Sequence, residues 1–534
     1  MRRSHSWITM ALALAACTRV QADRATTPLY DDLGTHSYAI ATEDPQVQRY
    51  FDQGLRLYYA FNHAEAIRAF EQAATLDPDC AMCYWGSALS YGPNINAPMD
   101  SAGGVAAYAA LAKAQAAAAT EPRERALIDA LSKRYAAAPA ANRAPLDSAY
   151  ANALAALVRQ YPDDHEIATL YAESLMDLSP WNYWTPAGEP RPQTPELLAH
   201  LERVIARNPQ HPGACHFYIH AVEAATPEKA VPCAERLASL MPGAGHLVHM
   251  PAHIYIRVGR WADAIQANEH AVHTDENYIR DQQPSAGVYT LGYYPHNYHF
   301  LSFASFMAGK SQQAITAARA VVEKVDASLA ATVPDFKPLP AYAHLALLNF
   351  GRWEDVLAAP MPAAELSVAS ALAHYARGVA FAATGRETDA KQELEVVRQL
   401  VASEPDEAAK PILQIAAHVL EGEIAARNNR HAEAIAAFRT AVDLEDGMTY
   451  IEPPLWYYPV RHSLGKSLLA AGRAQEAEQV YQQDLRRFPE NGWSLFGLEQ
   501  SLRAQQRTAD ADQVRQRFTQ AWRGADVQLA ASRF

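Results

Sequence analysis

Apolar residues recur along most of the chain at intervals of three and four positions, which is the spacing of amphipathic α-helices. No segment shows the alternating pattern of a half-buried β-strand. Short polar turns separate the helical stretches, and an alanine-rich run at 106–119 adds residues of high helix propensity. The pattern predicts an all-α protein with about ten or eleven helix pairs between residues 47 and 525.

Small residues, one aromatic residue and a closing proline mark a repeating unit. Gly54 is followed by Ala66, Phe70, Ala73 and Pro78, so that small residues let two helices approach and proline ends the second. Turns of the form Gly-Arg-x-x-(Asp/Glu)-Ala recur, in strict or weaker form, at 259–264, 309–314, 385–390, 429–434, 472–477 and 506–511. This unit resembles the tetratricopeptide repeat, a helix–turn–helix of 34 residues.

The resemblance implies a solenoid in which helix pairs stack into a right-handed superhelix with a concave groove. It also implies the ordinary role of such repeats, which is to bind a peptide or protein partner. Longer segments rich in Pro, Trp, Tyr and Asn interrupt the array and are expected to form loops near the groove. They lie at 92–104, 179–195, 274–294 and 325–340.

The first residues have the features of an export signal. Two arginines precede a short apolar run at 7–16, which is too short to span a bilayer as a helix. The sequence Leu-Ala-Ala-Cys ending at Cys17 resembles the lipobox of bacterial lipoproteins and would place a lipid on that cysteine, whereas cleavage after Ala22 is the alternative. We therefore predict an exported protein of the bacterial cell envelope, either periplasmic or a lipoprotein held at the membrane only by its lipid anchor. The predicted divisions are a signal at 1–22, a linker at 23–46, the repeat array at 47–525 and a tail at 526–534.

Charge and cysteine content narrow the function further. The net charge of −13 argues against nucleic-acid binding, which needs a basic face. If Cys17 carries a lipid, four cysteines remain, and an oxidising compartment would allow them to pair. Cys215 and Cys233 would lie on the two helices of one hairpin, where a disulfide is feasible. Cys80-Ala-Met-Cys83 is either a local disulfide or a pair of structural thiols, or alternatively a redox or metal-binding motif.

Half of the twenty histidines lie between residues 211 and 299, and the repeat frame places them on one side of the array. The resemblance implies that positions 2, 5, 9 and 12–13 of each first helix face the groove. With Ala264 at position 20 of its unit, His249 and His253 fall at positions 5 and 9, and Arg257 falls at position 13.

The neighbouring units repeat this placement. His296 and His299 fall at positions 2 and 5 of the next unit. In the preceding unit, His216 and His220 fall at positions 5 and 9 once a turn shorter by one residue is allowed for. Glu223 follows one turn after His220 and faces the same way.

These placements give our leading hypothesis, a metalloprotein whose groove histidines bind a transition metal ion. Imidazole nitrogens suit zinc, copper or iron, and the sequence leaves the choice among them open. Glu223 would orient a histidine or act as a base, and Arg257 would hold an anionic substrate. Because an ion with open coordination positions activates water or dioxygen, a hydrolase or an oxidase are the activities to consider. The alternative hypothesis is a cell-envelope scaffold that binds a peptide or protein without catalysis. The predicted metal ligands are His216, His220, His249, His253, His296 and His299.

Two further segments are candidates for a substrate or peptide groove. Glu452, Trp456, Tyr457 and Arg461 precede a first helix, and the alternative to a groove is aromatic packing with a Glu452–Arg461 ion pair. Glu173 lies one helical turn before Asp177, so both side chains point in similar directions. They either face the groove or lie at the solvated surface.

Overall fold

The computed structural model describes residues 27–117 and 121–534, so Cys17 and the predicted signal lie outside the described residues. The regular secondary structure of the described chain is helical, with two isolated bridges in loops. The predicted all-α, tetratricopeptide-like class is therefore confirmed. Within these ranges, no helix combines the length and the apolar character that crossing a membrane requires.

The described chain divides into two compact units, with borders in α13 and α14. The N-terminal unit comprises residues 27–254 and 270–293, and the C-terminal unit comprises Tyr255–Glu269 and Tyr294–Phe534. The helices up to this border are α2 (Pro45–Tyr59), α3 (His63–Leu76), α4 (Ala81–Ser90), α5 (Ser101–Ala116), α6 (Pro122–Leu131), α7 (Ala144–Gln160), α8 (His165–Asp177), α9 (Thr194–Arg207), α10 (Pro212–Val222), α11 (Val231–Leu240), α12 (Gly245–His249), α13 (Pro251–Arg257) and α14 (Trp261–Gln282).

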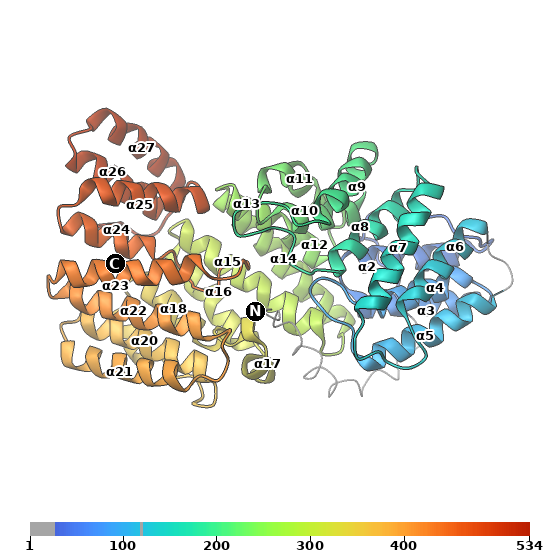
Figure 1. Ribbon diagram of the computed structural model, residues 1–534, viewed down its shortest axis with the longest axis horizontal. Coiled ribbons are helices and arrows are strands. Elements are labelled where there is room, and N and C mark those ends of the chain that lie inside the picture. Colours follow the sequence, from blue (N-terminus) through green and yellow to red (C-terminus); the bar gives the residue numbers. More distant parts are fainter. Residues whose placement is uncertain (1–26, 118–120) are drawn as a thin grey trace. The chain divides into compact units, whose positions relative to one another are not determined.

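The C-terminal unit continues as helix pairs, and in Figure 1 α20 to α23 lie side by side in orange. Its helices are α15 (Tyr294–Met307), α16 (Ser311–Lys324), α17 (Ala327–Thr332), α18 (Tyr342–Asn349), α19 (Trp353–Ala358), α20 (Ser367–Ala383), α21 (Glu387–Ser403), α22 (Lys410–Arg427), α23 (His431–Asp446), α24 (Arg461–Ala470), α25 (Ala474–Arg487), α26 (Gly492–Ala504) and α27 (Thr508–Ala521).

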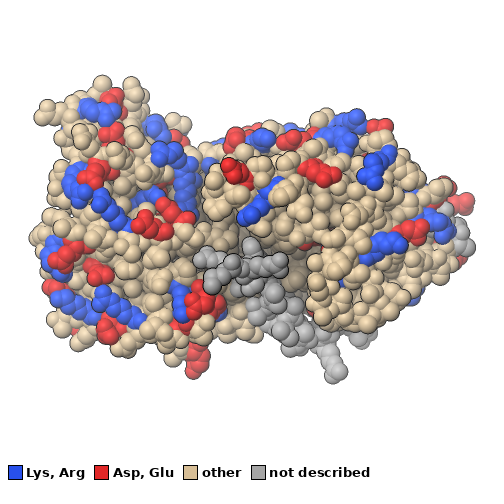
Figure 2. All heavy atoms as spheres, viewed as in Figure 1, with Lys and Arg blue, Asp and Glu red and all other residues tan. Residues whose placement is uncertain are grey.

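The recurring turn motif has a simple structural basis. Its first residue adopts a positive φ that favours glycine, as at Gly385 with φ of 78°, and this conformation ends the first helix. The following arginine then pairs with the acid three residues later, as in Arg386 and Asp389 at 2.6 Å. Such exposed pairs contribute little stability, on the order of 0–1 kcal/mol. Figure 2 shows basic and acidic side chains next to one another across this part of the C-terminal unit.

Small residues pack against an aromatic ring between consecutive helices. A Cβ atom added to Gly54 or Gly86 would lie 2.7 Å or 2.4 Å from the ring of Phe70. The spacing of Gly54 and Phe70 in the sequence thus reflects a contact between α2 and α3 that a larger residue would push apart. The same arrangement recurs at α24 to α26, where Gly465 and Gly497 contact the ring of Tyr481.

Residues 27–44 form no helix but pack against the N-terminal unit. The Tyr38 backbone N–H donates to Asp52 at 3.1 Å, and Leu33 is buried. Two expected loops are shorter than predicted. The segment 274–294 is helical up to Gln282 and forms a π-helical turn at Tyr289–Tyr293. The segment 325–340 contains α17, because the Asp326 side chain caps that helix.

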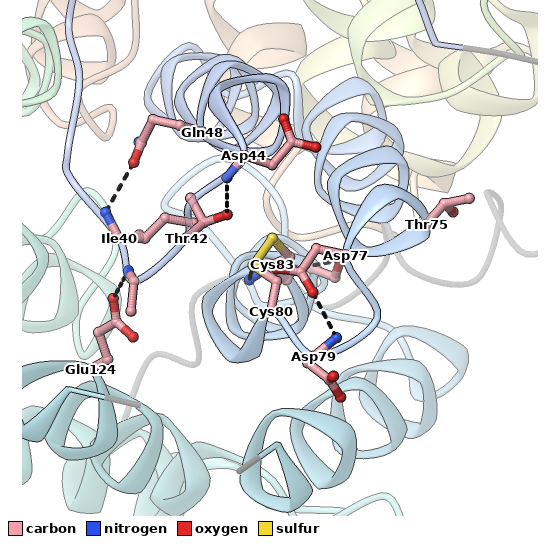
Figure 3. The surroundings of a disulfide bond; sticks show 12 residues. Ile40, Thr42, Asp44, Gln48, Thr75, Asp77, Asp79, Cys80, Cys83 and Glu124 are labelled. Carbon is pink, nitrogen blue, oxygen red and sulfur yellow. Dashed lines mark hydrogen bonds between the residues drawn. A yellow bond between two sulfur atoms is a disulfide. The ribbon is translucent and has the colours of Figure 1, made fainter. Parts of the chain in front are cut away.

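The four described cysteines lie in two pairs, of which one is joined by a disulfide and the other is not. Cys80 and Cys83 form a local disulfide at the start of α4, which is the first of the interpretations that the sequence offered for this motif (Figure 3). Cys215 on α10 and Cys233 on α11 face each other as predicted, with their sulfur atoms 2.7 Å apart. Both cysteines are buried and no bond joins them in the structure, so the disulfide that the sequence makes feasible stays a prediction.

Candidate metal centre

Helix α10 presents two buried histidines on one face. His211 caps the N-terminus of α10, because its Nδ1 accepts the Ala214 N–H at 3.2 Å. His216 and His220 come next on α10 and are one helical turn apart from each other, so their rings point to the same side. Their exposed fractions are 0% and 2%, and their ring centroids are 4.9 Å apart.

A third histidine, His246 on α12, completes the group. The Nε2 atoms of His216 and His246 are 3.1 Å apart. One ring nitrogen from each of His216, His220 and His246 lies within 4.8 Å of the others. Two ligand nitrogens that each lie about 2.0–2.1 Å from one zinc ion, at a tetrahedral angle, are roughly 3.4 Å from each other. The spacing of His216 and His246 is thus close to that of two ligands of one ion.

Hydrogen bonds on the far side of two rings leave their Nε2 atoms directed into the group. His216 Nδ1–H donates to the Tyr59 carbonyl oxygen at 2.7 Å, so the neutral ring keeps its lone pair on Nε2. His220 Nδ1–H donates to Glu223 Oε1 at 3.2 Å. The Nε2 atom of His220 is buried and has no hydrogen-bond partner among the described residues. A metal ion is a group that would satisfy such a nitrogen.

Glu223 connects this group to a second pair of histidines in the same unit. Its Oε2 accepts from His253 Nδ1 at 2.6 Å, while Oε1 accepts from His220. The Nε2 atom of His253 lies 2.9 Å from that of His249. Glu223 is fully buried, and a carboxylate at this position would offset the charge that a bound cation brings.

Burial keeps the candidate ligands neutral. Loss of solvent lowers the pKa of His220 to about 3 and holds the pKa of His216 well below its ordinary value. The neighbouring His220 lowers the pKa of His216 further. At neutral pH both rings therefore carry no positive charge, and binding an ion would not require them to lose one.

The structure divides the six predicted ligands between the two units. His216, His220, His249 and His253 lie in the N-terminal unit, and together with Glu223 they form the contacts described above. His296 and His299 lie on α15 in the C-terminal unit. Burial lowers the pKa of His299 to about 3, and its ring contacts Tyr342 at 4.5 Å. Their role as metal ligands stays a prediction.

Part of the predicted groove segment lines a pocket of the C-terminal unit. Arg257, Glu452 and Trp456 are among its lining residues. The Nε atom of Arg257 is 3.7 Å from Glu452 Oε1, and its guanidinium lies over the Tyr450 ring at 5.3 Å. The Trp456 side chain itself is almost fully buried.

Other predicted groove residues are core residues. Tyr457 is buried, and its hydroxyl lies 2.9 Å from that of Tyr375. Arg461 pairs with Asp446 at 2.6 Å and Glu452 lies 3.7 Å from Arg257, so the aromatic packing of the alternative interpretation is found without its Glu452–Arg461 ion pair. The Arg461–Asp446 pairing follows from the turn before α24, which brings Arg461 back to the end of α23. Glu173 is 3% exposed and accepts a hydrogen bond from Tyr58 at 2.5 Å, so it belongs to a buried polar network and not to the wall of a groove.

The sequence also contains a signal that marks His246 as a residue of the groove. In the frame that places His249 at position 5, His246 occupies position 2, which the resemblance also assigns to the groove. The Tyr59 carbonyl could not be found this way, since it comes from a distant helix. The same holds for a second buried network, in which Glu166 Oε1 lies 2.9 Å from His36 Nε2 and 3.1 Å from His211 Nε2.

This second network is a poor metal site despite its residue types. His211 Nδ1 accepts a backbone N–H, so the proton of the neutral ring sits on Nε2 and is donated to Glu166. Binding an ion at that Nε2 would displace this hydrogen bond and its proton. The network instead fixes His36, and with it the segment 27–44, to the N-terminal unit.

No protein-family model matches the sequence, and no curated protein is similar to it. Solved structures of similar architecture include the human IFIT1 dimer with m7Gppp-AAAA, at 12% identity and a TM-score of 0.31 over 91% of this chain and 92% of that chain. Yeast Tom70 has 11% identity and a TM-score of 0.28 over 89% and 91%. The APC/C hetero-tetramer Cut9–Hcn1 has 12% identity and a TM-score of 0.33 over 75% and 73%. Such weak likenesses carry nothing about the site. By its own helix pairs and turns, the chain is a tetratricopeptide-like helical-repeat protein with buried histidine groups.

Proposed function

We propose that this protein is a metalloprotein that holds a transition metal ion through His216, His220 and His246. The observation that carries the proposal is the convergence of three buried imidazoles, one of which has a ring nitrogen without a hydrogen-bond partner among the described residues. Nitrogen ligands of this kind suit zinc, copper or iron. When bound, the ion supplies a positive charge and coordination positions that can polarise a small molecule.

The surrounding residues prepare the three rings for this role. Tyr59 and Glu223 accept the Nδ1 protons of His216 and His220 and so fix both ring orientation and tautomer. Burial keeps competing water away from the nitrogens and strengthens the electrostatic effect of Glu223. His249 and His253 extend the group on the other side of Glu223 and are the nearest candidates for further ligands in this unit.

Metal content tests the proposal directly. The purified full chain is stripped with a chelator, reloaded with Zn²⁺, desalted and subjected to elemental analysis. We expect about one ion per chain in the wild type, and roughly a tenfold or greater loss of affinity in His220→Ala, because a ligand is removed. His344→Ala is the matched control, since His344 is a buried helical histidine of the C-terminal unit. A wild-type protein that retains no stoichiometric zinc, copper or iron would sink the proposal.

A second candidate function is recognition of a peptide end by the C-terminal unit. The supporting observation is the pocket that brings Arg257, Glu452 and Trp456 together. An arginine beside aromatic rings suits a peptide carboxylate, because the guanidinium can form charge-assisted hydrogen bonds with it. This role matches the ordinary use of helical repeats and does not depend on the metal centre.

Peptide libraries can test this second function. A random hexapeptide library with free C-terminal carboxylates should bind the immobilised protein, and the same library with amidated ends should bind less. Arg257→Ala should weaken capture about tenfold or more, which corresponds to one charge-assisted hydrogen bond. Equal capture of free and amidated peptides would argue against a carboxylate site. Arg352→Ala, an exposed arginine of the same unit, serves as the control.

A further inference from the structure

Phe61 stands where the repeat turn normally carries glycine. Its φ of 54° is in the left-handed region, which favours residues without a Cβ atom. The Asn62 N–H bonds to the Leu57 carbonyl at 3.0 Å, the same bond that Arg260 makes to Tyr255 after Gly259. The equivalent turn residues, each five positions before the small apolar residue of the second helix, are Gly259, Gly309, Gly351, Gly385, Asn429, Gly472 and Gln506.

A bulky aromatic residue in this conformation is unusual, and its surroundings suggest why it is there. The Phe61 ring contacts all three candidate ligands, with centroid distances of 4.5 Å to His216, 5.5 Å to His246 and 6.1 Å to His220. It lies nearly parallel to the rings of His246 and His220, at 26° and 17°. Only 3% of Phe61 is exposed. Strain of this kind tends to persist where a site requires it.

The chemistry of the ring fits a cover and not a ligand. A phenyl group has no lone pair or N–H to offer an ion, and it excludes the water that would compete for the imidazole nitrogens. Its stacking on two of the imidazoles also restricts their rotation. An ion that leaves the three nitrogens past Phe61 would have to displace this ring from the imidazoles that it contacts.

We propose that Phe61 is an aromatic cap that controls how fast the metal ion exchanges between the His216–His220–His246 site and solvent. This inference rests on the proposed metal centre. Phe61 is thus a positioning residue whose removal changes the rate of exchange more than the number of ions bound. The repeat scaffold retains its backbone at this turn without the ring, because glycine and asparagine occupy the equivalent position elsewhere in the chain.

Release of zinc to a chromophoric chelator measures this effect. The full chain is loaded with Zn²⁺, excess metal is removed, and the chelator is added while its absorbance is followed. We expect Phe61→Gly to release zinc at least about tenfold faster than wild type, a change equivalent to roughly one lost aromatic contact. The number of ions bound at the start should stay the same. Phe61→Asn introduces the residue found at the equivalent position 429 and should release zinc as fast as Phe61→Gly. If both variants release zinc faster, a folding defect in one of them is not the cause.

Gln506→Gly is the matched control, since it makes the same backbone change at a turn of the C-terminal unit. Its release rate should equal that of the wild type. If wild type, Phe61→Gly and Phe61→Asn all bind zinc and release it equally fast, the cap is wrong while the metal centre stands. If the wild type binds no zinc, copper or iron, the proposed function is wrong, and so is the role of Phe61 that depends on it.

Discussion

Replacing Arg134 with methionine is expected to destabilise the N-terminal unit by about 3–5 kcal/mol, because it leaves the buried carboxylate of Asp177 without its cation. Arg134 is 1% exposed, and its guanidinium contacts Asp177 at 2.5 Å and Asp147 at 3.5 Å. Burial alone would lower the pKa of Arg134, but Asp177 holds it well above its ordinary value. The shift of the urea unfolding transition, followed by circular dichroism, measures the loss.

A surface pair provides the contrast. Arg207 contacts Asp163 at 2.6 Å, yet its side chain is 52% exposed, so Arg207→Met should cost only about 0–1 kcal/mol. The loss in Arg134→Met should be partly recovered by adding Asp177→Leu, which removes the uncompensated carboxylate. Comparable losses in Arg134→Met and Arg207→Met, or no recovery in the double variant, would contradict this account of the buried network.

The pH dependence of the Arg134 variant follows from the same residues. Burial raises the pKa of Asp177, and Arg134 opposes that rise. Without Arg134, Asp177 of the folded protein keeps its proton up to a higher pH than Asp177 of the unfolded chain does. Stability therefore falls as pH rises above the ordinary carboxyl pKa. The destabilisation should be smaller at pH 5 than at pH 8.

In the proposed metal centre, substituting Glu223 with glutamine is expected to weaken zinc binding about 10–100-fold while leaving one ion per chain. A carboxylate can accept the Nδ1 protons of His220 and His253 at the same time, whereas the amide group offers only one accepting oxygen. One of the two rings must then rotate or change tautomer. The affinity is measured by competition with a chelator of known strength.

The matched control for this change is Glu393→Gln in the C-terminal unit. Glu393 accepts a hydrogen bond from His374 at 2.5 Å and is 7% exposed, so the substitution alters a similar pair away from the metal centre. Its zinc affinity should equal that of the wild type. An unchanged affinity in Glu223→Gln would show that this carboxylate does not prepare the histidines.

The fold was largely predictable because it is made of local repeats. A helix pair with Gly54, Ala66 and Phe70 at fixed spacing defines its own turn and its own packing, and the positive φ at Gly385 follows from the same motif. The predicted loop at 274–294 was less accurate than the predicted helix pairs. Helix α14 continues to Gln282 in this segment. The prediction failed here because nothing in the sequence of this long second helix marks where the helix ends.

The candidate site was predictable only in part. The repeat frame places His216, His220, His249 and His253 on first helices. His220 and His253 both contact Glu223, while His216 lies beside His220 and His249 beside His253. The frame did not show that His246 would come within 3.1 Å of His216, or that Glu173 would be buried beside Tyr58. Both depend on how neighbouring helix pairs pack against each other.

The helical-repeat architecture and the helices on which the histidines lie follow from the amino-acid sequence alone, because both depend on spacings of a few residues along one chain. The packing of distant helices sets which imidazoles lie together, which carbonyl and carboxylate accept their protons, and that the Phe61 ring contacts them. Those contacts join residues such as Tyr59 and His216, which are 157 positions apart. No local spacing encodes a distance that depends on the stacking of every helix pair between them.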